Sequence, residues 1–446
     1  MLPSCSTFRC PRSSRCRRLE RGNGVSQSRF RESLADRAAL PADNLPLKTG
    51  AALDLLEGVV VIDLTTSVAG PYCGQLLGDL GATVIKIEKP GSGDDCRSWG
   101  PPFLDGESLW FLSVNRNKHS VTLDVANPRG LETLLKMVER ADVVLLNLVE
   151  RAQKKLGVGY ASLAPRKKAL IHVSITGFGL SGARADMPCY DLTAEGYSGV
   201  MDMTGEADSN PQKVGAPAAD LLAGEDAAMA TLAAIIRRQR TGQGCQIDIS
   251  MVESMTRFMS PRLLPFLGSG DLTRRSGGRD SVIAIYQSFD TADLPLTLGL
   301  GNDAIFKRFW AAVGEPEVAG NPAYATNALR RAERTTLVAR IAKLLKTRPR
   351  DEWLAKFVAA RVPAGPINRL DEVAVDPELH ARSFLYAFER NGVRVPQVGL
   401  GIAFDGRSER CTKLAPRLGE DTDAVLRDWL QIPDAQLQEL RACKAI

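Results

Sequence analysis

The sequence predicts a doubly wound, Rossmann-like α/β domain with a second, smaller α+β domain. Apolar runs at 59–64 and 83–87 enclose one short helical segment, and this strand–helix–strand order favours a parallel sheet with right-handed crossovers. The alternation of strands and helices continues to about residue 250. A loop rich in glycine and arginine at 268–280 then separates the two domains. A chain of 446 residues is long enough for two or three domains, each with its own buried core.

The segment 58–95 contains the clearest strand–helix–strand unit. Its first strand is the β-branched run 59–64. Pro71 suits the first helical position, where no amide donor is needed, and Gly81 suits the C′ position that ends the helix. The second strand leads to Glu88, where a dinucleotide-binding domain places the acid that holds the ribose. The first turn reads S-V-A-G-P-Y-C-G instead of G-x-G-x-x-G, so the sequence disfavours an NAD site.

The later elements of the large domain follow the same alternation. We expect a helix at 128–141, strands at 143–148 and 170–175, a long helix after residue 220 and a strand at 246–250. The long helix has an apolar stripe, acidic residues early and arginines late, which complement the helix dipole.

The part of the chain after the 268–280 loop is predicted to form the smaller domain. We expect strands near 282–288 and 295–300, and helices near 302–312, 334–345 and 351–359. Mixed strands and helices of this kind indicate an α+β arrangement.

The N-terminal segment carries the excess of positive charge. Residues 1–30 contain seven arginines and a single acid, so the rest of the chain is nearly neutral although the net charge is +5. A nearly neutral body argues against a nucleic-acid surface. The Arg- and Ser-rich composition is typical of an organellar transit peptide, but an unstructured bacterial extension fits equally well. We therefore expect a cytoplasmic protein, or a mitochondrial one if the segment is a transit peptide.

Cysteine and histidine usage excludes other classes of protein. The nine cysteines form no C-x-x-C pair, which favours reduced thiols over a disulfide framework. With three histidines the sequence offers no metal cluster, and we expect no metal site.

No apolar run approaches the ~20 residues that span a bilayer, so we expect no membrane partner.

Two groups of residues are candidates for chemistry on their sequence context alone. Lys86, Lys89 and Arg97 surround a turn after a strand, where they could hold a phosphate or simply form a solvated loop. Asp220 lies directly before the long helix, after a run of small residues, where aspartate most often serves as an N-cap. The positive end of the helix would also keep this carboxylate ionised.

Many collinear motifs identify the chain as similar to the class III coenzyme A transferases, the family that includes the α-methylacyl-CoA racemases. The matching stretches run LTTSVAGPYCGQLLGDLGATVIKIEKPGSGDDCRSWGPP (64–102), LSVNRNKHSVTLDVANPRG (112–130), ADVVLLNLVERAQKKLGVGY (141–160), ITGFGLSGARADMPCYD (175–191), VGAPAADLLAG (214–224), YQSFDTAD (286–293), VPAGPINRLDEVAVDPELHAR (362–382) and PRLGEDTDAVL (416–426). The resemblance spans about 57–430 and is strongest to the succinyl-CoA:dicarboxylate branch, through GDDCRSWGPPF and LSVNRNKHS.

The resemblance implies covalent catalysis by Asp220. An ionised aspartate attacks the acyl-CoA donor to give a mixed anhydride, and released CoA then converts it to an aspartyl-CoA thioester. A free carboxylate takes up the CoA through a second anhydride. Succinyl-CoA is the expected donor and a small dicarboxylate the expected acceptor. CoA thioesters are substrates here, and no prosthetic group is expected.

Position 190 separates this activity from the alternatives. Racemases of the family resemble G-H-D at this motif, whereas this chain has C-Y-D with Tyr190 in place of the histidine. A tyrosine, with an ordinary pKa of ~10, is a poor base at neutral pH. Transfer is therefore favoured over racemase or lyase chemistry, and a CoA-binding module without turnover is a third possibility.

The resemblance also implies which residues surround the substrates. Residues expected along the CoA groove are Val68 and Ala69 near the adenine, Lys89 and Lys155 on phosphates, and Leu123 and Asn147 between them. Tyr190, Gly277 and Gly278 are expected in the acyl pocket. The loop 277–281 reads G-G-R-D-S where relatives have G-N-x-H-P.

Family members resemble one another in forming interlocked homodimers. By this resemblance, residues 51–265 and 375–446 form the large, CoA-binding domain and residues 275–370 the small one. Residues 1–50 remain as a basic extension that we expect to be disordered.

Overall fold

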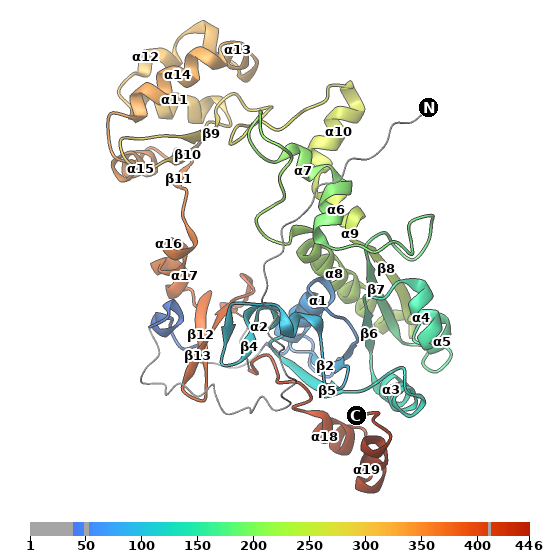
Figure 1. The fold of residues 1–446 in the computed structure, drawn as a ribbon. Helices are drawn as coiled ribbons and strands as arrows, with labels where there is room; N and C mark the ends of the chain where they lie inside the picture. The colour runs from blue at the N-terminus through green and yellow to red at the C-terminus, as the bar shows by residue number, and fades with distance from the viewer. Residues whose placement is uncertain (1–38, 49–52, 409–411) are drawn as a thin grey trace, which may run out of the picture. The chain divides into compact units, whose positions relative to one another are not determined.

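The computed structural model describes residues 39–48, 53–408 and 412–446 (Figure 1). The expectations for the basic segment 1–38 therefore lie outside the described residues. In the described chain, no helix is both long and apolar enough to cross a lipid bilayer.

A parallel sheet of six strands forms the centre of the fold, as predicted, and its strand order is β5-β2-β1-β6-β7-β8. The strands are β1 (Val60–Asp63), β2 (Thr83–Glu88), β5 (Lys118–Thr122), β6 (Val143–Leu146), β7 (Ile171–Thr176) and β8 (Cys245–Ser250). Counted along the chain, this is the 3-2-1-4-5-6 order of dinucleotide-binding folds, which reverses between β1 and β6. Ligands of such sheets bind at the carboxyl ends of the strands near that reversal.

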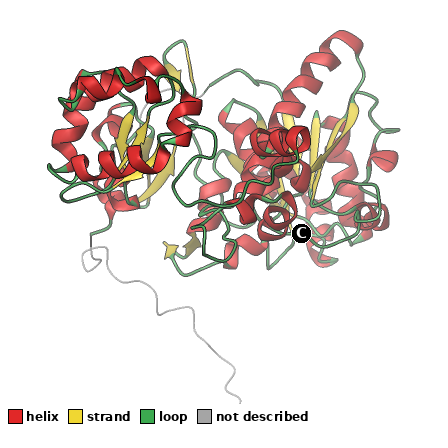
Figure 2. Cartoon of the chain, turned by 90° about the horizontal axis from the view of Figure 1, so that it is seen from above, coloured by secondary structure: helices red, strands yellow, loops and turns green. Residues whose placement is uncertain are grey.

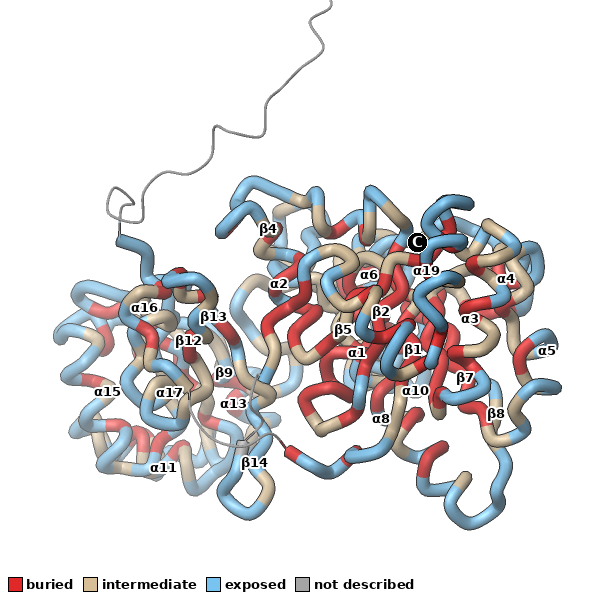
Figure 3. The backbone as a smooth tube through the Cα atoms, turned by 90° about the horizontal axis from the view of Figure 1, so that it is seen from below, coloured by how far each residue is buried: buried red, intermediate tan, exposed pale blue. Residues whose placement is uncertain are grey.

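Helices cover both faces of this sheet (Figure 2). Helices α1 (Ala69–Asp79) and α8 (Ala218–Thr241) pack in one apolar cluster, and α3 (Pro128–Arg140) and α19 (Asp434–Ala442) pack in the other. Neighbouring residues of β1 serve opposite faces, since Val61 belongs to the first cluster and Ile62 to the second. The tube in Figure 3 shows that the buried stretches concentrate in the strands and in the helices against them.

Glycine brings α1 and α8 close together. A Cβ atom at Gly224 of α8 would lie 2.7 Å from the main-chain oxygen of Ala69, a distance that real Cβ atoms do not adopt. The predicted role of Gly81 after α1 holds, since its φ of +104° is a conformation that glycine tolerates. Pro71 lies two residues inside α1 instead of opening it, because the helix begins at Ala69.

The remaining elements of the large part are short. They are β3 (Phe103–Leu104), β4 (Glu107–Ser108), α2 (Leu109–Val114), α4 (Glu150–Leu156), α5 (Tyr160–Leu163), α6 (Asp191–Ser198), α7 (Val200–Met203), α9 (Met251–Phe258) and α10 (Ser260–Ser269).

The second core belongs to residues 284–362. A three-stranded antiparallel sheet, β11-β10-β9, packs with α11, α14 and α15 around fully buried aromatic side chains such as Trp310 and Phe357. The elements here are β9 (Tyr286–Phe289), β10 (Leu296–Gly299), α11 (Asp303–Ala312), α12 (Pro316–Ala319), α13 (Asn327–Ala332), α14 (Arg334–Leu345), α15 (Arg350–Ala359) and β11 (Ala364–Pro366). The strand predicted near 282–288 begins only at Tyr286, because residues 281–285 form bends.

The C-terminal part contains α16 (Leu370–Ala374), α17 (Pro377–Ala381), the hairpin β12 (Leu385–Arg390) and β13 (Val393–Val398), β14 (Ala403–Phe404), β15 (Arg407–Ser408), α18 (Thr422–Ala424) and a π turn at Val425–Trp429. One boundary needs correction here. The 3-10 helix Pro41–Asn44 buries Ala42 against Ala387 of β12, and Leu47 forms a bridge to the same residue. The segment 41–48 therefore belongs to the folded body and not to the N-terminal extension.

Candidate active site

Asp220 lies in the first turn of α8, two residues after the helix begins at Ala218. It is not the N-cap that the sequence suggested, because Pro217 occupies that position and has no side-chain acceptor. The cap comes from another helix. One carboxylate oxygen of Asp191, the first residue of α6, accepts the N–H groups of Ala219 at 2.8 Å and of Asp220 at 3.3 Å. A residue far away in the chain thus caps the helix that carries Asp220.

The pKa of Asp220 moves in the opposite direction to our expectation. Burial, followed by the nearby charge of Asp191, raises this pKa from 3.8 to about 7. Asp191 accepts the N–H groups of Ala219 and of Asp220 itself, so these donors of the first turn of α8 are not available to the Asp220 carboxylate. Within the part of the chain that the structure describes, no donor forms a hydrogen bond to the Asp220 carboxylate. Asp220 is therefore a half-buried carboxylate that is about half ionised at neutral pH.

The main chain beside Asp220 is lined by small residues and leaves room for a ligand. A Cβ atom at Gly215 would meet no atom within 4 Å, so the turn before α8 is open beside the main chain. Cys189 packs against Gly177, and burial together with the charge of Asp220 raises the pKa of its thiol to about 11. This thiol is accordingly neutral at physiological pH. Tyr190 is 68 % exposed and directly precedes the capping Asp191.

A cavity of about 390 Å³ opens at the carboxyl ends of β1, β2, β5 and β6, at the edge of the sheet where ligands are expected. Its walls are largely apolar, and Lys89 and Leu123, two of the residues that the sequence assigns to a CoA groove, both line it. The lining residues are Leu64, Thr66, Ile87, Glu88, Lys89, Gly93, Asp94, Leu123, Asp124, Val125, Ala126, Leu148, Leu156 and Val158.

The other residues assigned to this groove lie at its margin. The amide group of Asn147 donates to the main-chain oxygen of Thr66 at 2.8 Å and accepts from the N–H of Thr66 at 3.2 Å, so it fixes one wall of the cavity. Lys155 is exposed on α4, next to Leu156 of the lining. Val68 and Ala69 are buried where α1 begins and do not line the cavity.

Two cations that could have held a phosphate are engaged elsewhere. The Lys86 ammonium group is fully buried and lies 2.8 Å from a carboxylate oxygen of Asp94. Arg97 donates to both oxygens of Glu88, at 2.7 and 2.6 Å. The phosphate hypothesis is therefore wrong for Lys86 and Arg97, and Lys89 remains as the cation that faces the cavity. The pairing also occupies Glu88, in agreement with the absence of an NAD fingerprint.

The glycine loop lies in a different environment from Asp220. Gly277 has a φ of +66° and donates its N–H to the main-chain oxygen of Gly205. It lines a second cavity of about 650 Å³ together with Met203, Met259, Arg262 and Arg279, whereas Gly278 is not among the lining residues. In the described residues, no contact of Tyr190, Gly277 or Gly278 with Asp220 is recorded, and Tyr190 is only the sequence neighbour of the capping Asp191.

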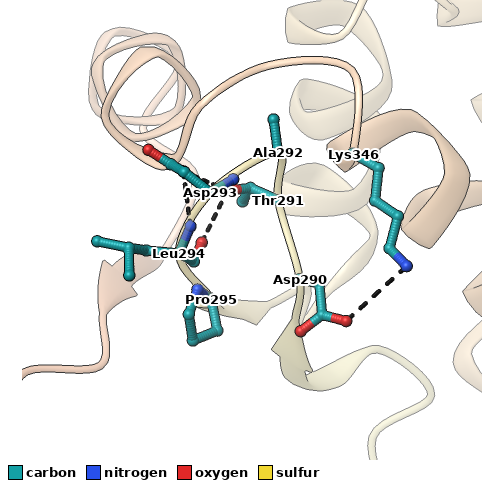
Figure 4. A pocket seen from close by; sticks show the side chains of 7 residues that line it. All are labelled: Asp290, Thr291, Ala292, Asp293, Leu294, Pro295 and Lys346. Atoms are coloured by element: carbon teal, nitrogen blue, oxygen red, sulfur yellow. Dashed lines mark hydrogen bonds and ion pairs between the residues drawn. The ribbon is translucent and has the colours of Figure 1, made fainter.

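Other polar clusters provide no alternative centre. Across the described ranges, no group of histidine, cysteine and acidic side chains is arranged to bind a metal ion. The pocket at 290–295 in the smaller domain is a surface turn (Figure 4). Asp293 there accepts hydrogen bonds from the Thr291 hydroxyl at 2.8 Å and from the Leu294 N–H at 2.7 Å, so the loop satisfies its own polar groups.

Sequence reasoning missed the structural role of α6. Among the sequence motifs Asp191 appears only as the last residue of C-Y-D, and none of the motifs contains Glu195. The available signal was their spacing, since acidic residues at i and i+4 share one face of a helix.

Comparison with known proteins gives a consistent result. The model of "CoA-transferase family III" matches residues 56–422. The chain is 37% identical over 381 residues to the succinate–glutarate CoA-transferase of Agrobacterium fabrum, covering 84% of this chain and 95% of that protein. It is 34% identical to the human succinyl-CoA:glutarate CoA-transferase, covering 86% and 88% respectively. A crystal structure of a CaiB/BaiF family protein from Brucella suis superimposes with a TM-score of 0.74 at 36% identity, covering 85% of this chain and all of that one.

The raised pKa of Asp220 predicts a stability that depends on pH. The folded protein holds the Asp220 proton between about pH 4 and 7 where the unfolded chain has lost it, so stability falls as pH rises through this window. Asn carries no such charge. At pH 8 we expect Asp220→Asn to be more stable than the parent protein by ~2 kcal/mol, about half of the full linkage value because solvent screens a half-buried group. Urea unfolding at pH 8 and pH 4 measures the difference, which should nearly vanish at the lower pH. Equal stabilities at pH 8 would contradict the pKa.

Proposed function

Because this chain belongs to CoA-transferase family III, we propose that it moves coenzyme A from succinyl-CoA to a small dicarboxylate through a thioester on Asp220. Membership confirms the family that the sequence motifs predicted, and with it the expectation of a CoA-transferase. The mechanism rests mainly on one observation. Asp220 is a half-buried carboxylate that no described donor holds, in the first turn of α8 beside an open turn of small residues.

The state of Asp220 suits nucleophilic attack on a thioester. A carboxylate with a pKa of about 7 is more basic than ordinary aspartate and is still substantially ionised at neutral pH. Its oxygen forms a bond to the succinyl carbonyl carbon, and the C–S bond breaks to release the CoA thiolate. The thiolate attacks the Asp220 carbonyl of the anhydride, so succinate leaves and aspartyl-CoA remains. An acceptor carboxylate repeats these two steps in reverse and leaves as its own CoA thioester.

The names of the relatives support the substrate class. The Agrobacterium and human relatives are named for succinate or succinyl-CoA with glutarate, and an enzyme from Chloroflexus aurantiacus for succinyl-CoA with D-citramalate. The acids in these names carry two carboxylates. To test the proposal, the purified protein is mixed with succinyl-CoA and a panel of mono- and dicarboxylic acids, and each acyl-CoA product is identified by mass. Exchange confined to monocarboxylic acids, or none at all, would refute the proposed substrate class.

The cavity at the sheet edge is the proposed place for the nucleotide part of CoA. Its apolar walls, including Leu123, suit an adenine ring, and Lys89 at the rim suits a phosphate. Val68, Ala69, Asn147 and Lys155 remain proposed contacts at its margin.

Lys89→Ala should weaken acyl-CoA binding with little effect on the chemical steps. Loss of one exposed phosphate contact predicts a rise in KM for succinyl-CoA of about five- to tenfold and a kcat within about twofold. The rise in KM should be smaller in high salt, because salt already screens the interaction between Lys89 and the phosphate in the parent enzyme. Steady-state kinetics at low and high ionic strength measure both parameters. Lys136→Ala is the matched control, since Lys136 is exposed on α3 and pairs only with Glu132 in its surroundings. Equal KM values for the two variants would show that Lys89 does not contact the bound acyl-CoA.

Racemase or lyase chemistry is the second candidate, because the family contains such enzymes. The exposed Tyr190 at the position of the racemase histidine argues against it. Incubation with succinyl-CoA or a 2-methylacyl-CoA in deuterated water distinguishes the two reactions. Deuterium at the α-carbon without acyl exchange would favour proton transfer over CoA transfer.

An interlocked homodimer and a cytoplasmic site of action complete the proposal, with a large domain at 51–265 and 375–446 and a small one at 275–370. Helix α10 supports an association of two chains, because it has no buried residue although four of its side chains are large and apolar. These side chains are Leu263, Leu264, Phe266 and Leu267. An uncovered apolar face of this kind is typical of subunit contacts. Light scattering on the eluting protein gives the oligomeric state, and a monomer would refute the dimer.

A further inference from the structure

Helix α6 presents two acidic side chains to the segment that carries Asp220. We propose that Asp191 and Glu195 are positioning residues for Asp220, and that Glu195 holds a proton and donates it in a hydrogen bond to Asp191. This inference rests on the proposed function for its catalytic meaning. It goes beyond that function in assigning two roles to residues one turn apart on α6.

Asp191 acts on the C-terminal end of the segment 214–220. Its Oδ1 atom accepts the N–H of Ala219 at 2.8 Å and the N–H of Asp220 itself at 3.3 Å. These contacts fix the main chain of the catalytic residue. They also place a negative charge next to its carboxylate, a charge that contributes to the raised pKa of Asp220.

Glu195 acts on the other end of the same segment. Its side chain is fully buried, and Oε2 accepts the N–H of Val214 at 2.9 Å. The two carboxylates therefore hold the segment 214–220 at both ends. The main chain that presents Asp220 is fixed by side chains of α6 and not only by its own helix.

The second oxygen of Glu195 indicates its protonation state. Oε1 is buried and accepts no hydrogen bond from any donor in the described residues. A buried oxygen left in this way is costly for a carboxylate but not for a carboxylic acid, whose hydroxyl is itself a donor. Asp191 is the acceptor for that proton. Burial raises the pKa of Glu195, and Asp191 raises it further by its charge and by hydrogen bonding.

The charged groups around Glu195 leave this assignment intact. Lys213 lies directly before the segment 214–220. Its charge lowers the pKa of Glu195, but this effect is small, whereas burial has the largest effect. On α9, which packs against α6, the charged side chains Glu253 and Arg257 are both exposed. Burial therefore has the largest effect on the pKa of Glu195. The N–H of Val214 is the main opposing influence, and Asp191 adds to the rise.

Two isosteric variants test the proposal. In Asp191→Asn the side-chain oxygen can still cap α8, but the charge is gone. In Glu195→Gln the amide can accept from Val214 and donate to Asp191, as a protonated glutamate would. Asp191→Ala and Glu195→Ala remove the contacts altogether. The pH dependence of kcat/KM for succinyl-CoA, between about pH 5 and 9, reports the ionisation of the nucleophile in the free enzyme.

We expect Asp191→Asn to move the acid limb of this profile about one pH unit lower, because the pKa of Asp220 falls when the neighbouring charge is removed. Glu195→Gln should retain kcat within about threefold, whereas Glu195→Ala should lose about tenfold in kcat with little change in KM. An unmoved acid limb in Asp191→Asn refutes the electrostatic role of Asp191. A loss in Glu195→Gln equal to that in Glu195→Ala refutes the protonated state. Failure of Glu195→Gln to fold also refutes it, since this variant keeps the proposed hydrogen bonds.

A readout without substrate separates this inference from the proposed function. The difference in thermal stability that Asp220→Asn produces, followed against pH, gives the pKa of Asp220 in the parent protein and in the Asp191→Asn background. A lower pKa in that background supports the role of Asp191 even if no acid accepts CoA. Absence of exchange in the parent enzyme would instead count against the proposed function alone.

Discussion

Asp220→Ala should abolish CoA transfer, with a fall in the exchange rate of at least about 1000-fold. The expectation is this large because the carboxylate forms the covalent intermediate in the proposed mechanism, and no other described acid lies in the first turn of α8. The measurement is the formation of acyl-CoA product from succinyl-CoA and the best acceptor of the panel. Circular dichroism and thermal unfolding show that the variant is folded. Glu225→Gln is the matched control, because Glu225 is an exposed acid on the same helix.

The intermediate itself provides a second measurement. Parent enzyme incubated with succinyl-CoA alone and quenched with hydroxylamine should carry a hydroxamate on the peptide that contains Asp220, and Asp220→Ala should carry none. Exchange that survives in Asp220→Ala would remove the covalent mechanism, although it would leave family membership untouched.

Lys86→Ala should destabilise the fold by ~3–5 kcal/mol, the usual cost of removing one partner from a buried ion pair. Lys86 is fully buried, lies 2.8 Å from Asp94 and donates to the main-chain oxygen of Thr65 at 2.7 Å. Without it, the fully buried carboxylates of Asp63 and Asp94 lose a countercharge. The change is measured as a lower midpoint of urea unfolding.

A matched control separates this effect from the loss of any lysine. Lys154 is 70% exposed and pairs with Glu150 one turn away on α4, so Lys154→Ala should change stability by less than about 0.5 kcal/mol. Equal midpoints for Lys86→Ala and Lys154→Ala would mean that the buried pair contributes no net stability.

The strands with continuous apolar runs could be predicted from the sequence, and β5 could not. Strands β1, β2, β6 and β7 are rich in valine, isoleucine and leucine, as buried parallel strands usually are. Strand β5 reads K-H-S-V-T, a pattern typical of a loop. It is the edge strand of the sheet, and its Lys118 can be buried because the ammonium group pairs with Asp63 at 3.0 Å. That partner is brought close only by the fold.

The candidate site shows the same limit. The sequence context and the family motifs led to Asp220, and in the structure this residue is a half-buried carboxylate in the first turn of α8. Its capping partner and the direction of its pKa could not be foreseen, because Asp191 belongs to another helix and occupies the amides that would have stabilised the ionised form. For the same reason, the sequence could not show which of the neighbouring positive side chains faces a cavity and which is paired with an acid. Whether Lys86, Lys89 or Arg97 faces a cavity depends on where Asp94 and Glu88 lie.

The contact between Gly224 and Ala69 has a consequence for substrate selection. In the proposed function, α1 begins near the nucleotide groove and α8 carries the nucleophile in its first turn, so the spacing of these helices would set the span between the two ends of a bound thioester. The main chains of the two helices meet at Gly224, so they cannot come closer together, and a larger side chain at this position would push them apart. In the proposed function, the distance between the groove and Asp220 would thus be the same for every acyl-CoA, and discrimination between acids would be left to the loops around the site.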